Sequence, residues 1–202
     1  AFAQQRTGNA AFRGYLEKFG FNEKTGIELP GELSGDLRQL GPGKPQINFA
    51  TASFGQGVAV TPIEMLQSMA AIANGGVLMR PYLDASDSPQ EVRRVISEEA
   101  AKQAIGMMVS AVDAAKVATI QGFSVAGKTG TAQIAARGGY GKDVIDTYIG
   151  FVPASDPKFI VFLKLDEAEG APHAAETVVP VFREFAQFLI NYYHVAPDRV
   201  AK

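Results

Sequence analysis

The sequence predicts an α/β chain of the α+β type, in which an antiparallel sheet is packed by helices. Three segments in the second half are apolar or alternate apolar with small residues, as strands do. They follow one another with only turns between them, and such strands pair antiparallel. The predicted strands are residues 123–133, 147–152 and 159–165. The predicted helices, marked by apolar residues at helical spacing, are residues 9–19, 61–73, 97–112 and 176–193.

The helix expected over residues 61–73 has the most specific boundary signals. Thr61 can accept a hydrogen bond from the third residue of the helix, Glu64 can accept one from the backbone of Thr61, and Pro62 suits the first helical position. The residues predicted to form its buried face are Met65, Leu66, Met69, Ile72 and Ala73.

The other three helices are marked by a stop, a cap or an apolar face. Gly20 is a natural stop for the first helix, and Ser97 is expected to cap the third, with Glu98 and Glu99 in its first turn. The face of the last helix expected to pack on the sheet consists of Val179, Phe182, Phe185, Ala186 and Leu189.

Gly, Pro and short polar residues predict irregular structure in four further segments: a surface stretch (20–46), a loop (48–57), a polar turn (84–90) and a mobile turn (138–141). Residues 76–83 are instead predicted to form a short edge strand, because Pro81 lies within them.

Composition and charge narrow the function. The chain has 202 residues, 47% of them hydrophobic, which is ample for a core, and a formal net charge of -2 that gives no basic face for nucleic acid. The absence of Cys excludes thiol nucleophiles and cysteine-bound metals. His173 and His194 have no metal-like or triad-like neighbours, so we expect no metal and no cofactor. No apolar run approaches the roughly 20 residues that span a bilayer.

The densest cluster of chemically capable residues runs from Ala126 to Gln133 and reads Ala-Gly-Lys-Thr-Gly-Thr-Ala-Gln. On a strand, Thr129 and Thr131 fall on one face and Lys128 on the other. The two glycines leave the backbone accessible to another chain or a ligand. The stretch therefore predicts a strand edge that receives an anion through an ammonium group, hydroxyls and free N–H groups.

A nucleotide-binding P-loop is one alternative for this stretch. Residues 122–129 have its spacing, and the acidic end of residues 162–167 could help to hold Mg²⁺. A P-loop, however, wraps phosphate with small residues and then opens into a helix. Here Phe123 and Val125 intervene, and Gly130 falls where the first helical turn should be, so this alternative is disfavoured.

Lys-Thr-Gly is also the third of three motifs in serine acyl-transferring enzymes, which include penicillin-binding proteins and class A β-lactamases. From about residue 12 to residue 190 the chain resembles the transpeptidase domain of class B, monofunctional, penicillin-binding proteins, and residues 126–133 match their AGKTGTAQ form. Between the third predicted helix and the Lys-Thr-Gly strand this family usually carries Gly-Thr-Gly or a similar sequence. Residues 113–118 of this chain do not, so the resemblance does not extend to this wall of the family's substrate cleft. The other landmarks are residues 19–21, 24–27, 29–32, 54–57 (Phe-Gly-Gln-Gly), Thr61-Pro62 and 73–76.

The resemblance implies a penicillin-binding-protein/β-lactamase-like transpeptidase fold and a D,D-transpeptidase that cross-links peptidoglycan and is acylated by β-lactams. Lys128 would attract the carboxylate of substrate or antibiotic, and the hydroxyls of Thr129 and Thr131 would hydrogen-bond it. The backbone N–H of Thr131 would be one oxyanion-hole donor. Gly130 would let the acyl group approach, Gln133 would line the cleft, and the stem peptide would pair with the strand edge.

The family's Ser-x-x-Lys and Ser-x-Asn elements have no credible counterpart in these residues. Ser155-Asp156-Pro157-Lys158 has the first spacing, but the family's serine opens a buried helix, whereas Pro157 between two strands makes a turn. Ala1 is expected to follow the Ser-x-Asn element. Residues 1–202 are therefore interpreted as the C-terminal part of one transpeptidase domain, with the nucleophile absent and no activity alone.

The partners implied by the resemblance are the peptidoglycan stem peptide, β-lactam antibiotics, the missing N-terminal half of the domain and a membrane glycosyltransferase of the wall-synthesis complex. The implied location is the extracytoplasmic side of the bacterial inner membrane, with an anchoring N-terminal helix outside this chain. A non-catalytic β-lactam-sensing or pseudo-enzyme domain on the same fold is the second alternative.

Overall fold

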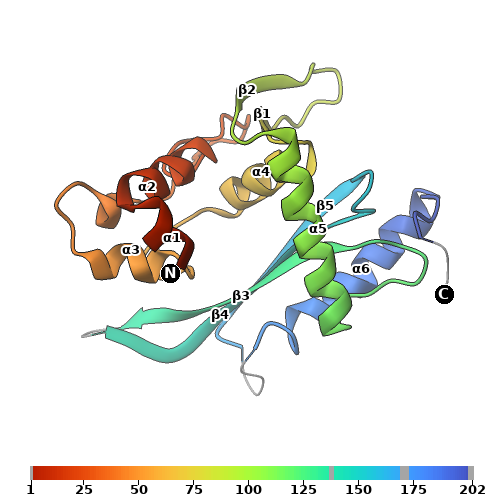
Figure 1. The fold of residues 1–202 in the computed structure, drawn as a ribbon. Coiled ribbons are helices and arrows are strands. Elements are labelled where there is room, and N and C mark those ends of the chain that lie inside the picture. Colours follow the sequence, from red (N-terminus) through yellow and green to blue (C-terminus); the bar gives the residue numbers. More distant parts are fainter. Residues whose placement is uncertain (1, 137–138, 169–172, 200–202) are drawn as a thin grey trace. The chain divides into compact units, whose positions relative to one another are not determined.

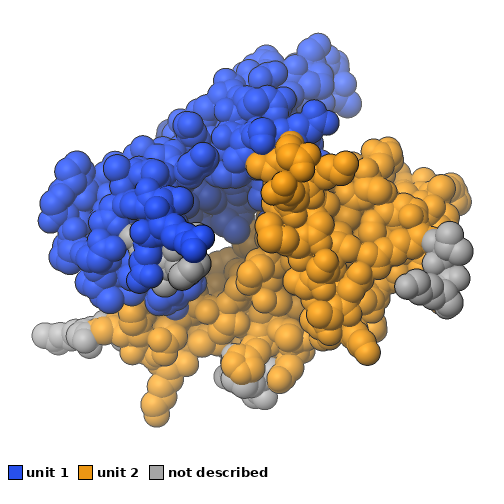
Figure 2. All heavy atoms as spheres, viewed as in Figure 1, with its two compact units in different colours: residues 1–98 blue, residues 99–202 orange. Residues whose placement is uncertain are grey.

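The computed structural model describes residues 2–136, 139–168 and 173–199. The chain divides into two compact units, Ala1–Glu98 and Glu99–Lys202, which are coloured separately in Figure 2. Each unit has its own buried residues and is described by itself.

The first unit combines short helices, long irregular segments and a two-stranded antiparallel sheet (Figure 1). One small core gathers Leu37, Leu40 and Phe49, and a second gathers Ala71, Leu78 and Val95. The elements are α1 (Phe2–Thr7), α2 (Asn9–Lys18), η1 (Arg38–Leu40), α3 (Gln46–Ala52), α4 (Pro62–Ala73), β1 (Val77–Arg80) and β2 (Gln90–Arg94).

The start of α4 confirms the predicted capping box. The Thr61 hydroxyl accepts a hydrogen bond from the Glu64 amide at 3.2 Å, and the Glu64 carboxylate accepts one from the Thr61 amide at 2.6 Å. Pro62 is the first helical residue. The two local rules that predict this boundary therefore both hold.

The buried face predicted for α4 is mostly wrong. Of its five apolar residues only Met69 is buried, and the other four are half-buried. The fully buried side instead carries Glu64, Gln67 and Ser68 together with Ala71. Each of these polar side chains has a backbone partner, such as the carbonyl of Met79, to which the Gln67 amide nitrogen donates at 2.9 Å, although the Gln67 side-chain oxygen has no partner among the described residues. Periodicity identifies the apolar side of a helix, but polar side chains can be buried where they are hydrogen-bonded.

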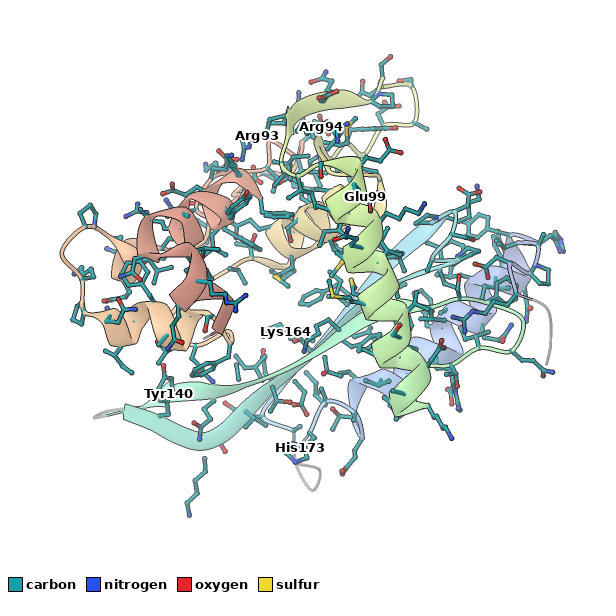
Figure 3. All side chains as sticks on the ribbon, in the orientation of Figure 1. Arg93, Arg94, Glu99, Tyr140, Lys164 and His173 are labelled. Carbon is teal, nitrogen blue, oxygen red and sulfur yellow. The ribbon has the colours of Figure 1, made fainter. Side chains whose placement is uncertain are left out.

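Two further expectations for this unit change. The loop predicted over residues 48–57 begins as α3, because Phe49 packs against Leu37 and Leu40 and Ser53 closes the helix with bonds back to its last turn. The edge strand expected near Pro81 is β1, and it pairs with β2, which the sequence analysis did not predict. Arg93 of β2 donates to the carbonyls of Glu17 and Lys18 at the end of α2 (Figure 3).

The second unit is the predicted antiparallel sheet with helices. Its strands occur in the order β3-β4-β5, and α6 packs on β4 and β5, where the rings of Tyr148 and Phe182 lie 4.6 Å apart (Figure 1). Val112 of α5 joins the same core. The elements are α5 (Glu98–Ala115), β3 (Ala126–Ala136), β4 (Gly139–Val152), β5 (Phe159–Asp166) and α6 (Val178–Tyr192).

Two strand boundaries and one helix face in this unit differ from the prediction. Strand β3 begins at Ala126 rather than at residue 123, and residues 139–141, expected in a turn, already belong to β4; Gly138 lies outside the described residues. The face predicted for the last helix is confirmed at Val179, Phe182 and Ala186, whereas Phe185 is 44% exposed. Because a strand continues as long as its partner continues, pairing extends β4 beyond the apolar residues that signal it.

Candidate functional site

The motif stretch 126–133 forms all but the last three residues of β3, and among the described residues β3 pairs with β4 alone. Lys128 lies opposite Ile149, Gly130 opposite Thr147, and Thr131 opposite Asp146. The outer edge of β3 is therefore the place where main-chain groups of the motif can meet a ligand.

The direction of the main-chain groups of β3 follows from the pairing of β4. The Glu167 amide donates to the carbonyl of Val144 at 2.9 Å, so Val144 faces β5. Because this direction alternates along an antiparallel strand, Asp146 also faces β5. Its opposite residue, Thr131, therefore directs its N–H and C=O away from β4, toward the outer edge of β3.

Lys128 and Thr129 are both exposed. The Lys128 ammonium donates to the carbonyl of Thr129 at 2.7 Å, which agrees with an outward direction for that carbonyl. An exposed ammonium, a hydroxyl and outward main-chain groups thus occupy neighbouring positions. This set can bind a carboxylate or stabilise a developing negative charge.

The hydroxyl of Thr131 already has partners inside the unit. It donates to Oδ1 of Asp146 at 2.8 Å and accepts from the Ala174 amide at 3.3 Å. The second oxygen of Asp146 accepts from the hydroxyl of Thr177 at 2.8 Å. Thr129 and Thr131 are both exposed, but the hydroxyl of Thr131 is hydrogen-bonded within the unit, so its backbone N–H is the group that it offers at the edge of β3.

Asp146 is the residue of this region that the sequence analysis missed. Its side chain is fully buried, and it lies in β4 between Ile145 and Thr147. Asp146 lies directly before the predicted strand 147–152 and becomes part of β4 only through pairing, so the sequence carried no local signal that its carboxylate is buried among hydrogen-bond donors. Its pairing with Thr131 depends on the β3-β4 register, which local patterns do not supply.

The two motif glycines are required by packing within the sheet. A Cβ atom at Gly127 would stand 2.0 Å from the Tyr148 hydroxyl oxygen, and one at Gly130 would stand 2.5 Å from Oγ1 of Thr147. Both facing residues belong to β4. The packing of the sheet therefore explains why both motif positions are glycine. For Gly130 this reason adds to the close approach of a ligand that the sequence predicts.

Gln133 is exposed near the far end of the motif, where its side-chain amide reaches the carbonyl of Gly141 at 3.5 Å. The other sequence landmark, Phe54 to Gly57, follows α3 in the first unit, and Phe54 is 66% exposed. The structure therefore keeps Lys128, Thr129, Gly130, Thr131 and Gln133 on one strand.

The Ser155 to Lys158 segment lies between β4 and β5, as predicted, and not at the start of a helix. The Ser155 hydroxyl donates to Asp198 at 2.6 Å, and Lys158 forms an ion pair with Asp156 at 2.5 Å. The serine and the lysine thus have other partners. This arrangement supports the rejection of Ser155 as a nucleophile.

The start of β3 is tied to the end of the described chain. The amide and the hydroxyl of Ser124 both donate to the carboxylate of Asp198. Partial burial alone would raise the pKa of Asp198, but the hydrogen bonds from Ser124 and Ser155 outweigh it and hold that pKa below its ordinary value. Arg199, the next residue, pairs with Asp113 of α5 through two bonds of 2.8 and 2.9 Å.

The P-loop alternative finds no support in the described residues. A P-loop needs a helix after Lys128, but the chain continues as strand β3 to Ala136. In residues 2–136, 139–168 and 173–199, no three acidic or histidine side chains gather as a metal site. His173 is exposed on the segment that leads to α6 (Figure 3). No helix of this described part is long and apolar enough to cross a membrane.

Comparison with known proteins connects this geometry to a family. The family model described as the penicillin binding protein transpeptidase domain matches residues 1–187. Stage V sporulation protein D of Bacillus subtilis (strain 168) is 37% identical in an alignment of 192 residues that covers 86% of this chain and 29% of that protein. A probable peptidoglycan D,D-transpeptidase PenA of Neisseria meningitidis serogroup A is 29% identical in an alignment of 197 residues that covers 92% of this chain and 34% of that protein.

A solved structure gives the same fold. Penicillin binding protein 3 from Mycobacterium tuberculosis, complexed with ampicillin, matches with a TM-score of 0.81 and 28% identity over 98% of this chain and 49% of that chain. The mixed helical and antiparallel architecture predicted from the sequence is thus confirmed. The chain spans about a third or less of the two relatives, and about half of the solved protein.

Proposed function

This chain belongs to the family of penicillin-binding protein transpeptidase domains, and from this premise we propose that it forms the substrate-binding part of a serine-type peptidoglycan D,D-transpeptidase. In this proposal β3 binds the stem peptide or a β-lactam. The nucleophilic serine comes from a part of the polypeptide outside residues 1–202. The names of the relatives support the reaction class, since one of them is a probable peptidoglycan D,D-transpeptidase.

The observation that carries the proposal is the outward edge of β3. Lys128 and the hydroxyl of Thr129 are exposed beside it, and an ammonium and a hydroxyl donor suit the carboxylate of a stem peptide or a penicillin. An extended peptide can add to an open strand edge by main-chain pairing. The binding determinants of such a substrate therefore match the groups that this strand presents.

The backbone N–H of Thr131 would serve the chemical step. When the serine oxygen attacks the carbonyl carbon, the carbonyl oxygen becomes negative, and the C–N bond then breaks as the amine leaves with a proton. A donor held toward that oxygen can stabilise the transition state by roughly 3 kcal/mol. In this role Thr131 acts through its backbone, because its hydroxyl is bonded to Asp146.

Acylation by a labelled penicillin tests the proposal. The complete polypeptide that carries this chain is incubated with the reagent, and intact mass is followed over time. We expect one covalent adduct on the complete polypeptide and none on residues 1–202 alone. Labelling of residues 1–202 alone would show that Ser155 or another residue here is the nucleophile, and labelling of neither would favour the pseudo-enzyme alternative.

A matched pair of lysine variants tests the role of β3. Lys128→Gln should slow acylation about tenfold or more, because a charged hydrogen bond to the carboxylate is lost. Lys142→Gln, which changes an exposed lysine on β4, should leave the rate unchanged. An equal effect of both substitutions would contradict a specific role of Lys128.

The same family membership supports a location and partners for the complete protein. We place it on the extracytoplasmic side of the inner membrane, anchored by a helix outside residues 1–202 and working with a membrane glycosyltransferase. Protease accessibility of the chain in spheroplasts tests the location. Protection equal to that of a cytoplasmic marker would contradict it.

A further inference from the structure

The carboxylate of Asp146 connects three segments of the second unit. It belongs to β4, and its two oxygens accept from Thr131 of β3 and from Thr177, directly before α6, each at 2.8 Å. The Thr131 hydroxyl in turn accepts from the buried amide of Ala174 at 3.3 Å. A fully buried carboxylate is costly unless donors surround it, so its presence in this core calls for a reason.

The direction of the Thr131 hydroxyl follows from these bonds. Its oxygen accepts from the Ala174 amide, and its one hydrogen is then available for Asp146. Both partners lie on the inner side of β3. The side chain of Thr131 is thus held from two sides, and its rotamer is fixed by groups that no substrate touches.

Fixing this side chain also fixes the peptide unit before it. The N–H of Thr131 points to the outer edge of β3, and a rotation of this residue that displaced the N–H would also pull its hydroxyl away from Asp146. Thr131 and Asp146 form a pair in which the facing main-chain groups are not bonded to each other, and the neighbouring pairs Gly130–Thr147 and Ala132–Ile145 carry the ladder bonds. The carboxylate adds a side-chain bond between the two strands at this position.

We propose that Asp146 is a positioning residue that, through the Thr131 hydroxyl, holds the outward N–H of Thr131 in place for the acyl-transfer step. The proposal rests on the proposed function, because the N–H is the oxyanion donor there. Asp146 itself touches no substrate. A donor displaced by a fraction of an ångström loses much of its effect on the transition state, so the tie acts on rate rather than on binding.

The kinetic test separates binding from the chemical step of penicillin acylation in the complete polypeptide. Asp146→Ala should lower the first-order acylation rate constant about 10- to 100-fold, with the half-saturating penicillin concentration little changed. Asp146→Asn should recover most of the rate, since its oxygen can accept from Thr131 while its amide donates to Thr177. Thr177→Val removes only the other arm of the cluster and should leave the rate constant unchanged.

A double-mutant cycle tests the route through the hydroxyl. In a Thr131→Val background, Asp146→Ala should produce no further fall in the rate constant, because the tie is already broken. Additive losses, or an equal loss in Thr177→Val, would show that Asp146 only supports the core and would overturn the proposal. Thr131→Val and Asp146→Asn keep the shape of the core, so the test stands even if Asp146→Ala does not fold.

A second readout does not depend on activity. The order parameter of the Thr131 N–H, measured by ¹⁵N relaxation, should fall in Asp146→Ala and Thr131→Val and stay unchanged in Thr177→Val. Unchanged mobility of this N–H would overturn the positioning proposal even in an enzyme that is acylated. If the unsubstituted protein is not acylated but the mobility changes occur as expected, the proposed function is overturned. The role of Asp146 in holding the Thr131 N–H would then still stand.

Discussion

A side-chain carbon at Gly127 would stand 2.0 Å from the hydroxyl oxygen of Tyr148, on the facing strand. The Tyr148 ring is buried against Phe182 of α6, so it has little room to move aside. The first glycine of the motif is therefore required by the sheet itself, before any ligand is considered.

Gly127→Ala should consequently destabilise the second unit. Overpacking of a filled core typically costs about 1–3 kcal/mol, and here the contact is with a buried ring. The measurement is the denaturant midpoint of the complete protein, with amide exchange of β3 and β4 as the local probe. Gly106→Ala is the control: it lies in α5 with nothing within 4 Å of the added carbon, and it should stabilise by up to about 1 kcal/mol. Equal effects of the two substitutions would contradict the packing argument.

Tyr148→Phe should stabilise the protein or leave its stability unchanged. The Tyr148 hydroxyl is buried and has no hydrogen-bond partner among the described residues, and burial raises the pKa of its phenol. Removing an unpaired buried hydroxyl recovers roughly 1 kcal/mol. Thermal unfolding of the two proteins decides the point. A clear loss of stability in Tyr148→Phe would mean that the hydroxyl does have a partner.

Asp198 should make stability depend on pH at the acid end. The pKa of its carboxyl is lowered in the folded state, where hydrogen bonds from Ser124 and Ser155 outweigh the opposite effect of burial. A lowered folded pKa contributes stability that is present above the unfolded value of about 3.9 and is lost as the pH falls through the folded value. Asp198→Asn should therefore lower stability at pH 7 and flatten its decline below about pH 4.

Denaturant midpoints at neutral and acid pH measure this effect. Asp156→Asn is the matched control, because Asp156 lies in the same turn as Ser155 with 73% of its side chain exposed. Its midpoint should follow that of the unsubstituted protein at every pH. The role of Asp198 would be refuted by an acid decline that stays equally steep after Asp198→Asn.

Glu64→Gln should destabilise the first unit by about 1–3 kcal/mol. The buried carboxylate accepts from the amides of Asn22, Gly35 and Thr61 at 3.1, 2.7 and 2.6 Å. A glutamine can keep only one of the two accepting oxygens, so an N–H group then faces another donor. Amide exchange of the segment around Gly35 is the local measurement, and Glu91→Gln on the exposed strand β2 is the control. Equal protection in both variants would contradict this role of Glu64.

The elements that the sequence predicts correctly are marked by signals that act over a few residues. Thr61, Pro62 and Glu64 predict the start of α4 because capping involves neighbours within one turn. The apolar runs of β4 and β5 and the short connection between them predict an antiparallel pair for the same reason. The motif Lys128-Thr129-Gly130 lies on a strand as predicted, because its residue types and its flanks suit one.

The predictions that are wrong concern which side of an element is buried and which segment packs against or pairs with it. Met65 and Leu66 of α4 are half-buried while Gln67 and Ser68 are buried. A periodic pattern shows which side of a helix is apolar, but not which segment lies against it. Strand β2 was missed because its residues are mostly exposed and polar, so only its pairing with β1 marks it as a strand.

The sequence by itself determined the family and the strand that carries the Lys-Thr-Gly motif, because motif residues and their order are properties of the chain itself. The tertiary structure alone decided that Asp146 stands opposite Thr131, that Tyr148 closes over Gly127, and that the Thr131 N–H points outward. These relations depend on the register between β3 and β4, and a shift of one residue would reverse the face of every side chain. Register is set by the packing of the whole sheet, which no short pattern contains.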